Sequence, residues 1–239
     1  MQTATVTIRH IDNVADIRAV EQLQKEVWGI PDLDVVPLTQ LVAAKEAGGT
    51  LIGAFDDDVL VGFVYGFASF EFGKHAHHSH MLAVKPEYRN HDLGRRLKLA
   101  QREQVIAQGI DLITWTFDPL QSLNAHFNFN KLGVVADRYL PDFYGDEPAS
   151  FLHQTGTDRL WVSWFVSESR SSLVFDSNDS ITIEIPGDIN SLVQQQPQTA
   201  RKWREETRRA FMEGIKAGYV VVGFTRENDV GKYLLQRSV

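Results

Sequence analysis

Hydrophobic and polar positions in the first third of the chain follow two periods. Residues 5–11 alternate between the two kinds, as they do in a half-buried strand. The next hydrophobic positions fall at helical spacing and predict a helix capped by Asp12: Ile17, Val20, Leu23 and Val27. A second helix is expected over residues 37–47, closed by two glycines. Two strands follow over residues 50–56 and 59–70, joined by an acidic turn.

The same two periods continue through the middle of the chain. Residues 80–84 predict a strand that a Lys-Pro pair ends. Residues 92–108 predict an amphipathic helix with these residues on its inner face: Leu93, Leu97, Ala100 and Val105. The later pattern predicts a strand, a helix stopped by a glycine and two further strands, over residues 111–119, 120–132, 134–140 and 159–166.

Helices alternating with strands from residue 5 to 166 predict an α/β (α+β) fold, with helices on both faces of one mixed sheet. Serine, aspartate and asparagine accumulate over residues 167–179 and indicate a boundary. Beyond it we expect a strand, a glutamine-rich spacer, a long helix and a hairpin. Residues 171–239 would form a small extension docked on residues 1–170, because a segment of this size buries little apolar surface alone. Whether this extension is a degenerate half-repeat of the N-terminal section stays open.

Composition narrows the function classes. The chain has 239 residues and a net charge of -7, and it lacks the basic stripe of a nucleic-acid binder. It has no cysteine, which excludes a disulfide scaffold, a thiolate nucleophile and cysteine-ligated metals. The N-terminus lacks the basic and apolar regions of a signal peptide, and no apolar run approaches the ~20 residues that span a bilayer. We therefore expect a cytoplasmic protein with no nucleic-acid or membrane partner.

Four of the eight histidines lie within six positions of the stretch GKHAHHSHMLAV. His78 and His80 stand two residues apart on the predicted strand, and an imidazole with a pKa near ~6.5 can accept a proton around neutral pH. A His-x-His pair on a strand also suits zinc, with Glu71 or His75 as a third ligand. The plainest interpretation is a set of partly exposed strand residues bonded to their neighbours, which we favour for His75 and His77.

The segment over residues 77–108 predicts a strand, a short polar loop and a helix that begins at once. The N-terminus of a helix carries unpaired N–H groups and a partial positive charge, and this suits a phosphate or pyrophosphate. Three arginines add permanent charge around it: Arg89, Arg95 and Arg96. The alternative is a surface helix capped by Asp92 and flanked by solvated arginines.

Within this loop the run VKPEYRNHDLG resembles the acetyl-CoA loop of the GNAT N-acetyltransferase superfamily. The family pattern is Arg or Gln, two residues, Gly, one residue, then Gly or Ala. Arg89 and Gly94 match it, and Val84 stands five residues before the arginine. The run ITWTFDPLQSLNAHFNFNKLG is similar to the family's next strand and helix. Together with the order of elements, the resemblance covers about two thirds of the chain.

The resemblance implies a GNAT-like sheet, with residues 1–170 as the catalytic domain that binds acetyl-CoA and no metal cofactor. The backbone of residues 82–84 would pair with the pantetheine arm, and the N–H near Leu82 would stabilise the oxyanion of the thioester carbonyl. The implied cofactor-binding residues are Met81, Leu82, Ala83, Val84, Arg89, Asn90, His91, Asp92, Leu93, Gly94, Arg95 and Asn124.

The tract HSHMLAV is also similar to the corresponding strand of the arylalkylamine N-acetyltransferases. The resemblance implies that His78 and His80 remove the proton of the attacking amine, partly through water. Strand alternation predicts that these two histidines share one face with Leu82 and Val84, with the imidazoles about 6–7 Å apart.

Two positions depart from the family pattern. Asp92 replaces the first glycine of the loop, and we expect its carboxylate to turn back and cap the helix N–H groups. Phe129 stands where the family often has a tyrosine that acts as the general acid. The candidates for the general acid are therefore Tyr139 and Tyr144, with Tyr65 on the preceding strand as another.

These residues predict an acetyltransferase that moves an acetyl group from acetyl-CoA to a primary amine by direct attack on the thioester. The acidic surface and the supply of aromatic residues favour a small-molecule acceptor, and a protein N-terminus or lysine stays open. The competing hypothesis is a non-catalytic sensor that binds CoA or acyl-CoA on the same fold, which Asp92 and Phe129 favour. Whether the chain forms a homodimer also stays open.

Overall fold

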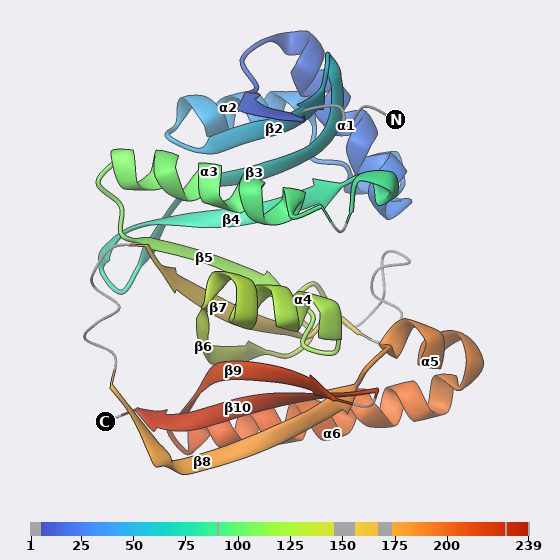
Figure 1. The fold of residues 1–239 in the computed structure, drawn as a ribbon, viewed down its shortest axis with the longest axis vertical. Coiled ribbons are helices and arrows are strands. Elements are labelled where there is room, and N and C mark those ends of the chain that lie inside the picture. The colour runs from blue at the N-terminus through green and yellow to red at the C-terminus, as the bar shows by residue number, and fades with distance from the viewer. Residues whose placement is uncertain (1–5, 90, 146–155, 167–173, 228, 239) are drawn as a thin grey trace. The chain divides into compact units, whose positions relative to one another are not determined.

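The computed structural model describes residues 6–89, 91–145, 156–166, 174–227 and 229–238, and the chain divides into two compact units (Figure 1). Unit 1 is Met1–Thr114 and unit 2 is Trp115–Val239. The division falls inside strand β5 (Leu112–Phe117), whereas composition indicated a boundary near residue 170. The assignment of residues 1–170 and 171–239 as functional domains stays a prediction.

Unit 1 is a sheet with strand order β1-β2-β3-β4-β5, covered by helices on both faces. Neighbouring strands from β1 to β4 are antiparallel, and β4 pairs with β5 in parallel. The elements are β1 (Thr7–His10), α1 (Val14–Trp28), the 3-10 turn η1 (Asp32–Asp34), α2 (Leu38–Glu46), β2 (Thr50–Asp56), β3 (Val59–Glu71), β4 (Lys74–Val84), the 3-10 turn η2 (Pro86–Tyr88), α3 (Leu93–Ala107) and the start of β5.

A hydrophobic core lies on each face of this sheet. On one face, Leu23 of α1 and Leu41 of α2 pack with Phe63 and Tyr65 of β3. On the other face, Leu93 and Leu97 of α3 pack with residues of β2 and β3: Ile52, Ala54, Val61 and Val64. Figure 1 shows α3 lying along the face of β3 and β4. The predicted sandwich of helices around one sheet is confirmed for this unit.

Unit 2 contains the remainder of β5 and five further strands, of which β7-β6-β9-β10-β8 are neighbours in that order. Its elements are α4 (Ser122–His126), the π-helical turn η3 (Phe127–Leu132), β6 (Val135–Leu140), β7 (Arg159–Phe165), β8 (Phe175–Pro186), α5 (Ile189–Gln195), α6 (Pro197–Lys216), β9 (Tyr219–Glu227) and β10 (Val230–Ser238). Aromatic rings form its centre: Phe211 and Phe224 pack around Tyr233, whose hydroxyl donates to the carbonyl of Pro119 at 2.6 Å.

Several local expectations differ from the structure. Asn13, and not Asp12, caps α1 by accepting from the backbone of Asp16. The glutamine-rich spacer contains α5. The strand–helix–strand–strand segment at the end of unit 2 has a different pairing from the start of unit 1: β8 pairs with the second hairpin strand, β10, whereas β1 pairs with the first, β2. Among the described helices, none combines the length and the apolar composition that a transmembrane helix needs.

Candidate active site

Strand β4 contains a bulge at His80. Tyr65 of β3 lies opposite Met81, and the next residue, Gly66, lies opposite Ser79, so that one extra residue of β4 has no partner on β3. A bulge of this kind reverses the side-chain alternation of the strand beyond it. The backbone is also re-aimed at this point, in the middle of the histidine stretch.

The bulge overturns the predicted sharing of faces. Leu82 and Val84 pack in the core that α3 covers. The rings of His78 and His80 lie against Phe67, which packs in the core that α1 and α2 cover. The expectation that the two histidines share a face with Leu82 and Val84 was therefore wrong, because uninterrupted alternation was assumed.

The two imidazoles nevertheless form a pair. The ring centroids of His78 and His80 are 6.3 Å apart, within the expected spacing. The ring of Phe67 is tilted against both, at 5.3 and 5.7 Å. The Nδ1 of His78 lies 3.1 Å from the hydroxyl of Thr114. This bond orients the ring of His78 toward the α1 and α2 side of the sheet.

The surroundings of His80 favour its neutral form. Its ring lies edge-on to Tyr65, with centroids 6.1 Å apart, although the residue as a whole is exposed. Partial burial of the ring disfavours the imidazolium and lowers the pKa of His80 below its ordinary 6.5. A neutral imidazole at neutral pH can accept a proton. Burial raises the pKa of Tyr65, which makes that phenol a weaker acid.

The zinc interpretation of these histidines has no third ligand in the structure. Within the five described ranges, no group of three or more histidine, aspartate or glutamate side chains could hold a metal ion. His75 is exposed at the start of β4, where its ring lies edge-on to that of Phe70.

His77 belongs to a buried polar network on the α3 side of β4. It is 0% exposed, and its Nε2 lies 3.1 Å from the hydroxyl of Thr50 and 3.4 Å from Nε2 of Gln101. Burial and the charge of Lys98 lower the pKa of His77 to about 4. These contacts fit the interpretation of His77 as a strand residue bonded to its neighbours. The residue is fully buried, however, whereas partial exposure was expected.

Lys98 is the residue that the sequence analysis missed. It lies on α3, is only 3% exposed, and its Nζ donates to the hydroxyl of Ser79 at 2.7 Å. The sequence held a signal: Lys98 and Gln101 fall between Leu97 and Val105 on the inner face of the predicted helix, where polar residues are unexpected.

The N-terminus of α3 is open to an anion. Asp92 precedes the helix with a left-handed backbone, φ 57°, and its side chain caps no helix N–H. Its carboxylate lies 3.3 Å from Nη1 of Arg95. The expectation that Asp92 caps the helix was wrong, because the left-handed backbone does not aim the side chain at the first turn. The guanidinium of Arg95 instead offsets the charge of Asp92.

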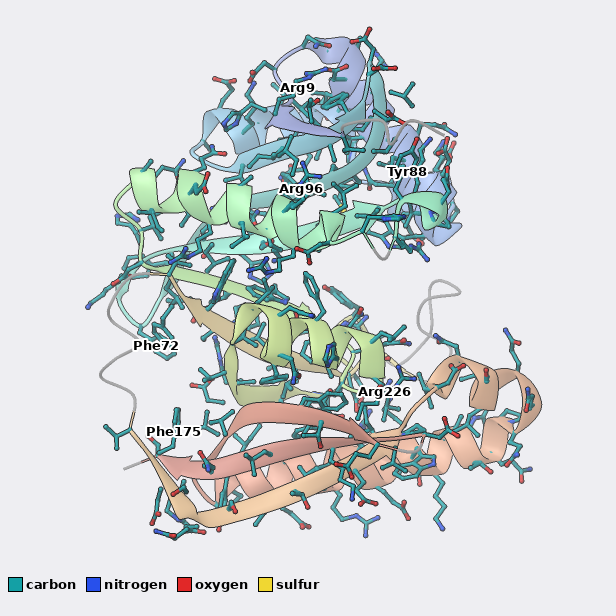
Figure 2. All side chains as sticks on the ribbon, in the orientation of Figure 1. Arg9, Phe72, Tyr88, Arg96, Phe175 and Arg226 are labelled. Atoms are coloured by element: carbon teal, nitrogen blue, oxygen red, sulfur yellow. The ribbon has the colours of Figure 1, made fainter. Side chains whose placement is uncertain are left out.

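The loop before α3 is held in place from both sides. The hydroxyl of Tyr88 donates to Asp56 at 2.6 Å, and Nη2 of Arg96 donates to the carbonyl of Val6 at 2.8 Å; Figure 2 labels Tyr88 and Arg96. The Nε of Arg89 donates to the carbonyl of Val84 at 3.1 Å, across the turn. These bonds fix the loop, and the exposed Arg89 precedes the helix while the half-buried Arg95 stands in its first turn.

The predicted loop residues are otherwise distributed as follows. Leu93 is buried in the α3 core and Gly94 is in the first turn of the helix, whereas His91 is exposed. Asn90 lies outside the described residues. The first N–H groups of α3 lack a partner within the helix, as at any helix start. These groups and two arginines are the donors that a pyrophosphate needs.

The edge of β4 suits an extended amide chain. Parallel pairing of β4 with β5 is described only at His77–Ile113 and His78–Thr114. Among the described pairs, residues 81–84 are bonded to β3 on one side and to no strand on the other. Such a free edge offers backbone donors and acceptors to an added strand. The donor set of this strand, loop and helix therefore fits a ligand with a pyrophosphate and an amide-containing arm.

Three predicted residues belong to unit 2. Asn124 is exposed on α4. Tyr139 is buried; its hydroxyl donates to the carboxylate of Asp158 at 2.6 Å, and burial together with that carboxylate raises its pKa. Tyr144 is exposed, and its ring lies 5.1 Å from the guanidinium of Arg159. Their assigned roles in cofactor binding and acid catalysis stay predictions.

Phe129 is buried in unit 2 between two other rings, Phe117 and Tyr233. It therefore has a packing role.

Comparisons with known proteins agree with this geometry. The fold is similar to the ribosomal-protein-S18-alanine N-acetyltransferase of Escherichia coli, with a TM-score of 0.55, 13% identity, and coverage of 72% of this chain and 100% of that one. It is also similar to Salmonella typhimurium yncA with its cofactor acetyl-CoA, with a TM-score of 0.52, 19% identity and coverage of 69% and 95%.

A third similar structure is the aminoglycoside 6'-N-acetyltransferase of Enterococcus faecium, with a TM-score of 0.50, 19% identity and coverage of 67% and 97%. No curated protein matches the sequence. Residues 14–134, just over half of the chain, match the family described as Acetyltransferase (GNAT) family. The chain therefore belongs to the GNAT acetyltransferase family and is an acetyl-CoA-dependent N-acetyltransferase.

Proposed function

We propose that this protein acetylates a primary amine of a small molecule, with His78 and His80 as the pair that removes the amine's proton. The observation that carries the proposal is the bulge at His80. It leaves two imidazoles on the α1 and α2 side of β4. They stand immediately before residues 81–84, whose backbone pairs with β3 alone among the described strand pairs.

The residues of unit 1 divide the work of binding. The N–H groups of the first turn of α3, with Arg89 and Arg95, would hold the pyrophosphate of acetyl-CoA. The backbone of residues 82–84 would hold the pantetheine arm, and the N–H of Leu82 would donate to the thioester carbonyl. When bound, acetyl-CoA supplies an acetyl group activated as a thioester and a thiol leaving group.

The histidines supply the base. An ammonium group cannot attack a carbonyl, so the acceptor must lose a proton before or during attack. His80 has a lowered pKa and accepts that proton as a neutral imidazole. His78, with its ring centroid 6.3 Å away, lies at a distance that one bridging water can span, and it can pass the proton on.

The acceptor class follows from the side of the sheet on which the histidines lie. Phe67 contacts both imidazoles, and Tyr65 contacts His80, so the surface beside the base is aromatic. Aromatic faces suit the apolar body of a small amine and attract a cationic one. Among the similar structures, one is named for an aminoglycoside and one for a ribosomal-protein alanine, so both acceptor classes enter the test.

Calorimetry with acetyl-CoA, followed by a thiol-release assay, tests the proposal. We expect binding at sub-millimolar acetyl-CoA and CoA release with primary amines in the panel. The panel holds small amines together with peptides that have free N-termini. Absence of acetyl-CoA binding would refute the transferase assignment. Binding without CoA release from any amine would favour the sensor, and release with peptides alone would replace the small-molecule acceptor.

A further inference from the structure

Ser79 of β4 and Lys98 of α3 form a buried polar pair. Both side chains are 3% exposed, and the ammonium of Lys98 donates to the Ser79 hydroxyl at 2.7 Å. A methionine or leucine at position 98 would fill the inner face of α3 without the cost of removing a charge from water. Burial lowers the pKa of Lys98 well below its ordinary 10.5. Burial therefore makes the ammonium of Lys98 a stronger acid than that of an exposed lysine.

The position of the pair relative to the bulge is specific. Ser79 stands between His78 and His80 in sequence, and its side chain lies on the opposite side of the sheet. The N–H groups at the start of α3, which are proposed to bind the pyrophosphate, also lie on the α3 side. The bulge therefore separates two sets of proton-carrying groups: imidazoles on the α1 and α2 side, and the hydroxyl–ammonium pair on the α3 side.

The reaction needs a proton donor for the departing sulfur. When the C–S bond breaks, the sulfur leaves as a thiolate, and a thiol has an ordinary pKa near ~8.5. A proton donor whose pKa lies near that of the leaving group is the most efficient acid. An ordinary lysine is too weak an acid for this task, and the desolvation of Lys98 moves it in the required direction.

We propose that Ser79 and Lys98 form the proton-donating pair of the reaction, with Ser79 as the catalytic residue beside the leaving sulfur and Lys98 as the residue that supplies it. This inference rests on the proposed function. The amine nitrogen forms a bond to the acetyl carbon, the C–S bond breaks, and sulfur keeps the electron pair. Ser79 gives its hydroxyl proton to sulfur and takes one from Lys98. Lys98 is left neutral and regains its proton by the reverse path, through Ser79, from water that enters once CoA has left.

His77 of β4 is a titratable neighbour of this ammonium. His77 lies close enough for the charge of Lys98 to lower its pKa, and the pKa of about 4 keeps that imidazole neutral at the pH of the reaction. His77 therefore does not compete with Ser79 for the proton of Lys98. Its bonds to Thr50 and Gln101 belong to the same buried layer.

Four variants test the pair: Ser79→Ala, Lys98→Met, Ser79→Thr and the matched control Thr50→Val. Thr50→Val removes a buried hydroxyl from the same side of the sheet without touching the pair. The first readout needs no turnover: the pKa of the thiol of enzyme-bound CoA, followed by thiolate absorbance. The second is the rate of CoA release in a single turnover, with acetyl-CoA affinity measured in parallel.

We expect the wild type to bind CoA with a thiol pKa below that of free CoA, because a nearby ammonium favours the thiolate. Lys98→Met should return the pKa toward ~8.5. Lys98→Met and Ser79→Ala should slow CoA release by about 100-fold, with little change in acetyl-CoA affinity. Ser79→Thr keeps the hydroxyl and should retain most of the rate, and Thr50→Val should behave as the wild type.

The outcomes separate this inference from the proposed function. A wild-type protein that does not bind acetyl-CoA would refute the proposed function and with it this pair. A wild-type protein that turns over at a rate unaffected by Ser79→Ala and Lys98→Met would refute the pair alone. A slower Lys98→Met enzyme whose bound thiol keeps the wild-type pKa would assign Lys98 a purely structural role, and so would overturn the inference.

Discussion

Gly66 occupies the point of β3 where β4 makes its bulge, and its missing side chain leaves room for the histidine layer. A Cβ at this position would lie 2.4 Å from Nε2 of His77, 2.7 Å from the carbonyl oxygen of His78 and 2.9 Å from Nε2 of Gln101. The His78 oxygen belongs to the backbone and cannot rotate away. Gly66→Ala must therefore push β4 from β3, or displace His77 from its bond to Thr50.

The expected magnitude follows from three terms. Overpacking a filled core destabilises a protein by about 1–3 kcal/mol. Loss of the buried hydrogen bond of His77 adds roughly 1 kcal/mol. Alanine restricts the unfolded chain and returns about 0.4–1 kcal/mol of stability. The net loss is about 1–4 kcal/mol, which lowers the melting temperature by about 2–14 °C for a chain of this size.

Urea unfolding followed by circular dichroism measures this loss, and kcat/KM measures the effect on the bulge. We expect both to fall, because displacement of β4 moves His80 as well as His77. The control is Gly223→Ala on β9, where a Cβ would meet Leu234 at an ordinary 3.7 Å and should cause no loss. Equal unfolding midpoints for Gly66→Ala and Gly223→Ala would refute the tight packing at the bulge and the reasoning built on it.

His80 must be neutral to accept a proton, and its pKa is lowered, so kcat/KM should fall only as pH drops through a value below 6.5. His80→Gln should lower turnover and remove this acidic limb of the pH profile. An acidic limb that persists in the variant would assign the titration to another group. Asp92→Gly removes a carboxylate beside the proposed pyrophosphate site and a non-glycine residue with positive φ. Calorimetry should show that the affinity for acetyl-CoA rises about fivefold, which corresponds to roughly 1 kcal/mol. Weaker binding would contradict the anion site. Arg204 is 4% exposed and donates to both carboxylate oxygens of Asp118 at 2.7 Å. Arg204→Met leaves that carboxylate buried without its partner and should lower the free energy of unfolding, measured in urea, by about 3–5 kcal/mol. Adding Asp118→Leu should restore much of the loss, and no recovery would show that the loss has another origin.

Local periodicity predicted most elements of unit 1, because each has one side in a core. The helix expected over residues 92–108 is α3, Leu93–Ala107, and the strand expected over residues 50–56 is β2, Thr50–Asp56. Helix ends were less accurate: the cap of α1 is Asn13, one residue beyond the predicted Asp12. Both side chains suit a cap, and only the backbone conformation chooses between them.

Periodicity failed where two strands had to be aligned. The faces of His78 and His80 relative to Leu82 depend on one unpaired residue in β4, and that residue depends on Gly66 in the neighbouring strand. No pattern within β4 records this, because alternation is a property of one strand and a bulge is a property of a pair. The side chain of Asp92 was misassigned for a similar reason, since the left-handed backbone of the loop directs it to Arg95.

The amino-acid sequence was sufficient for the class of fold, the loop that fits a pyrophosphate and the family, because these depend on short-range spacing: a strand, a turn and a helix start within about thirty residues. Tertiary structure alone decided which side of the sheet each proton-carrying group faces. Lys98 meets Ser79 across 19 positions of the chain, and His77 meets Thr50 across 27. Such contacts form only when α3 packs on β4 and β3 pairs with both β2 and β4. The desolvation that lowers the pKa of Lys98 arises from the same packing of α3.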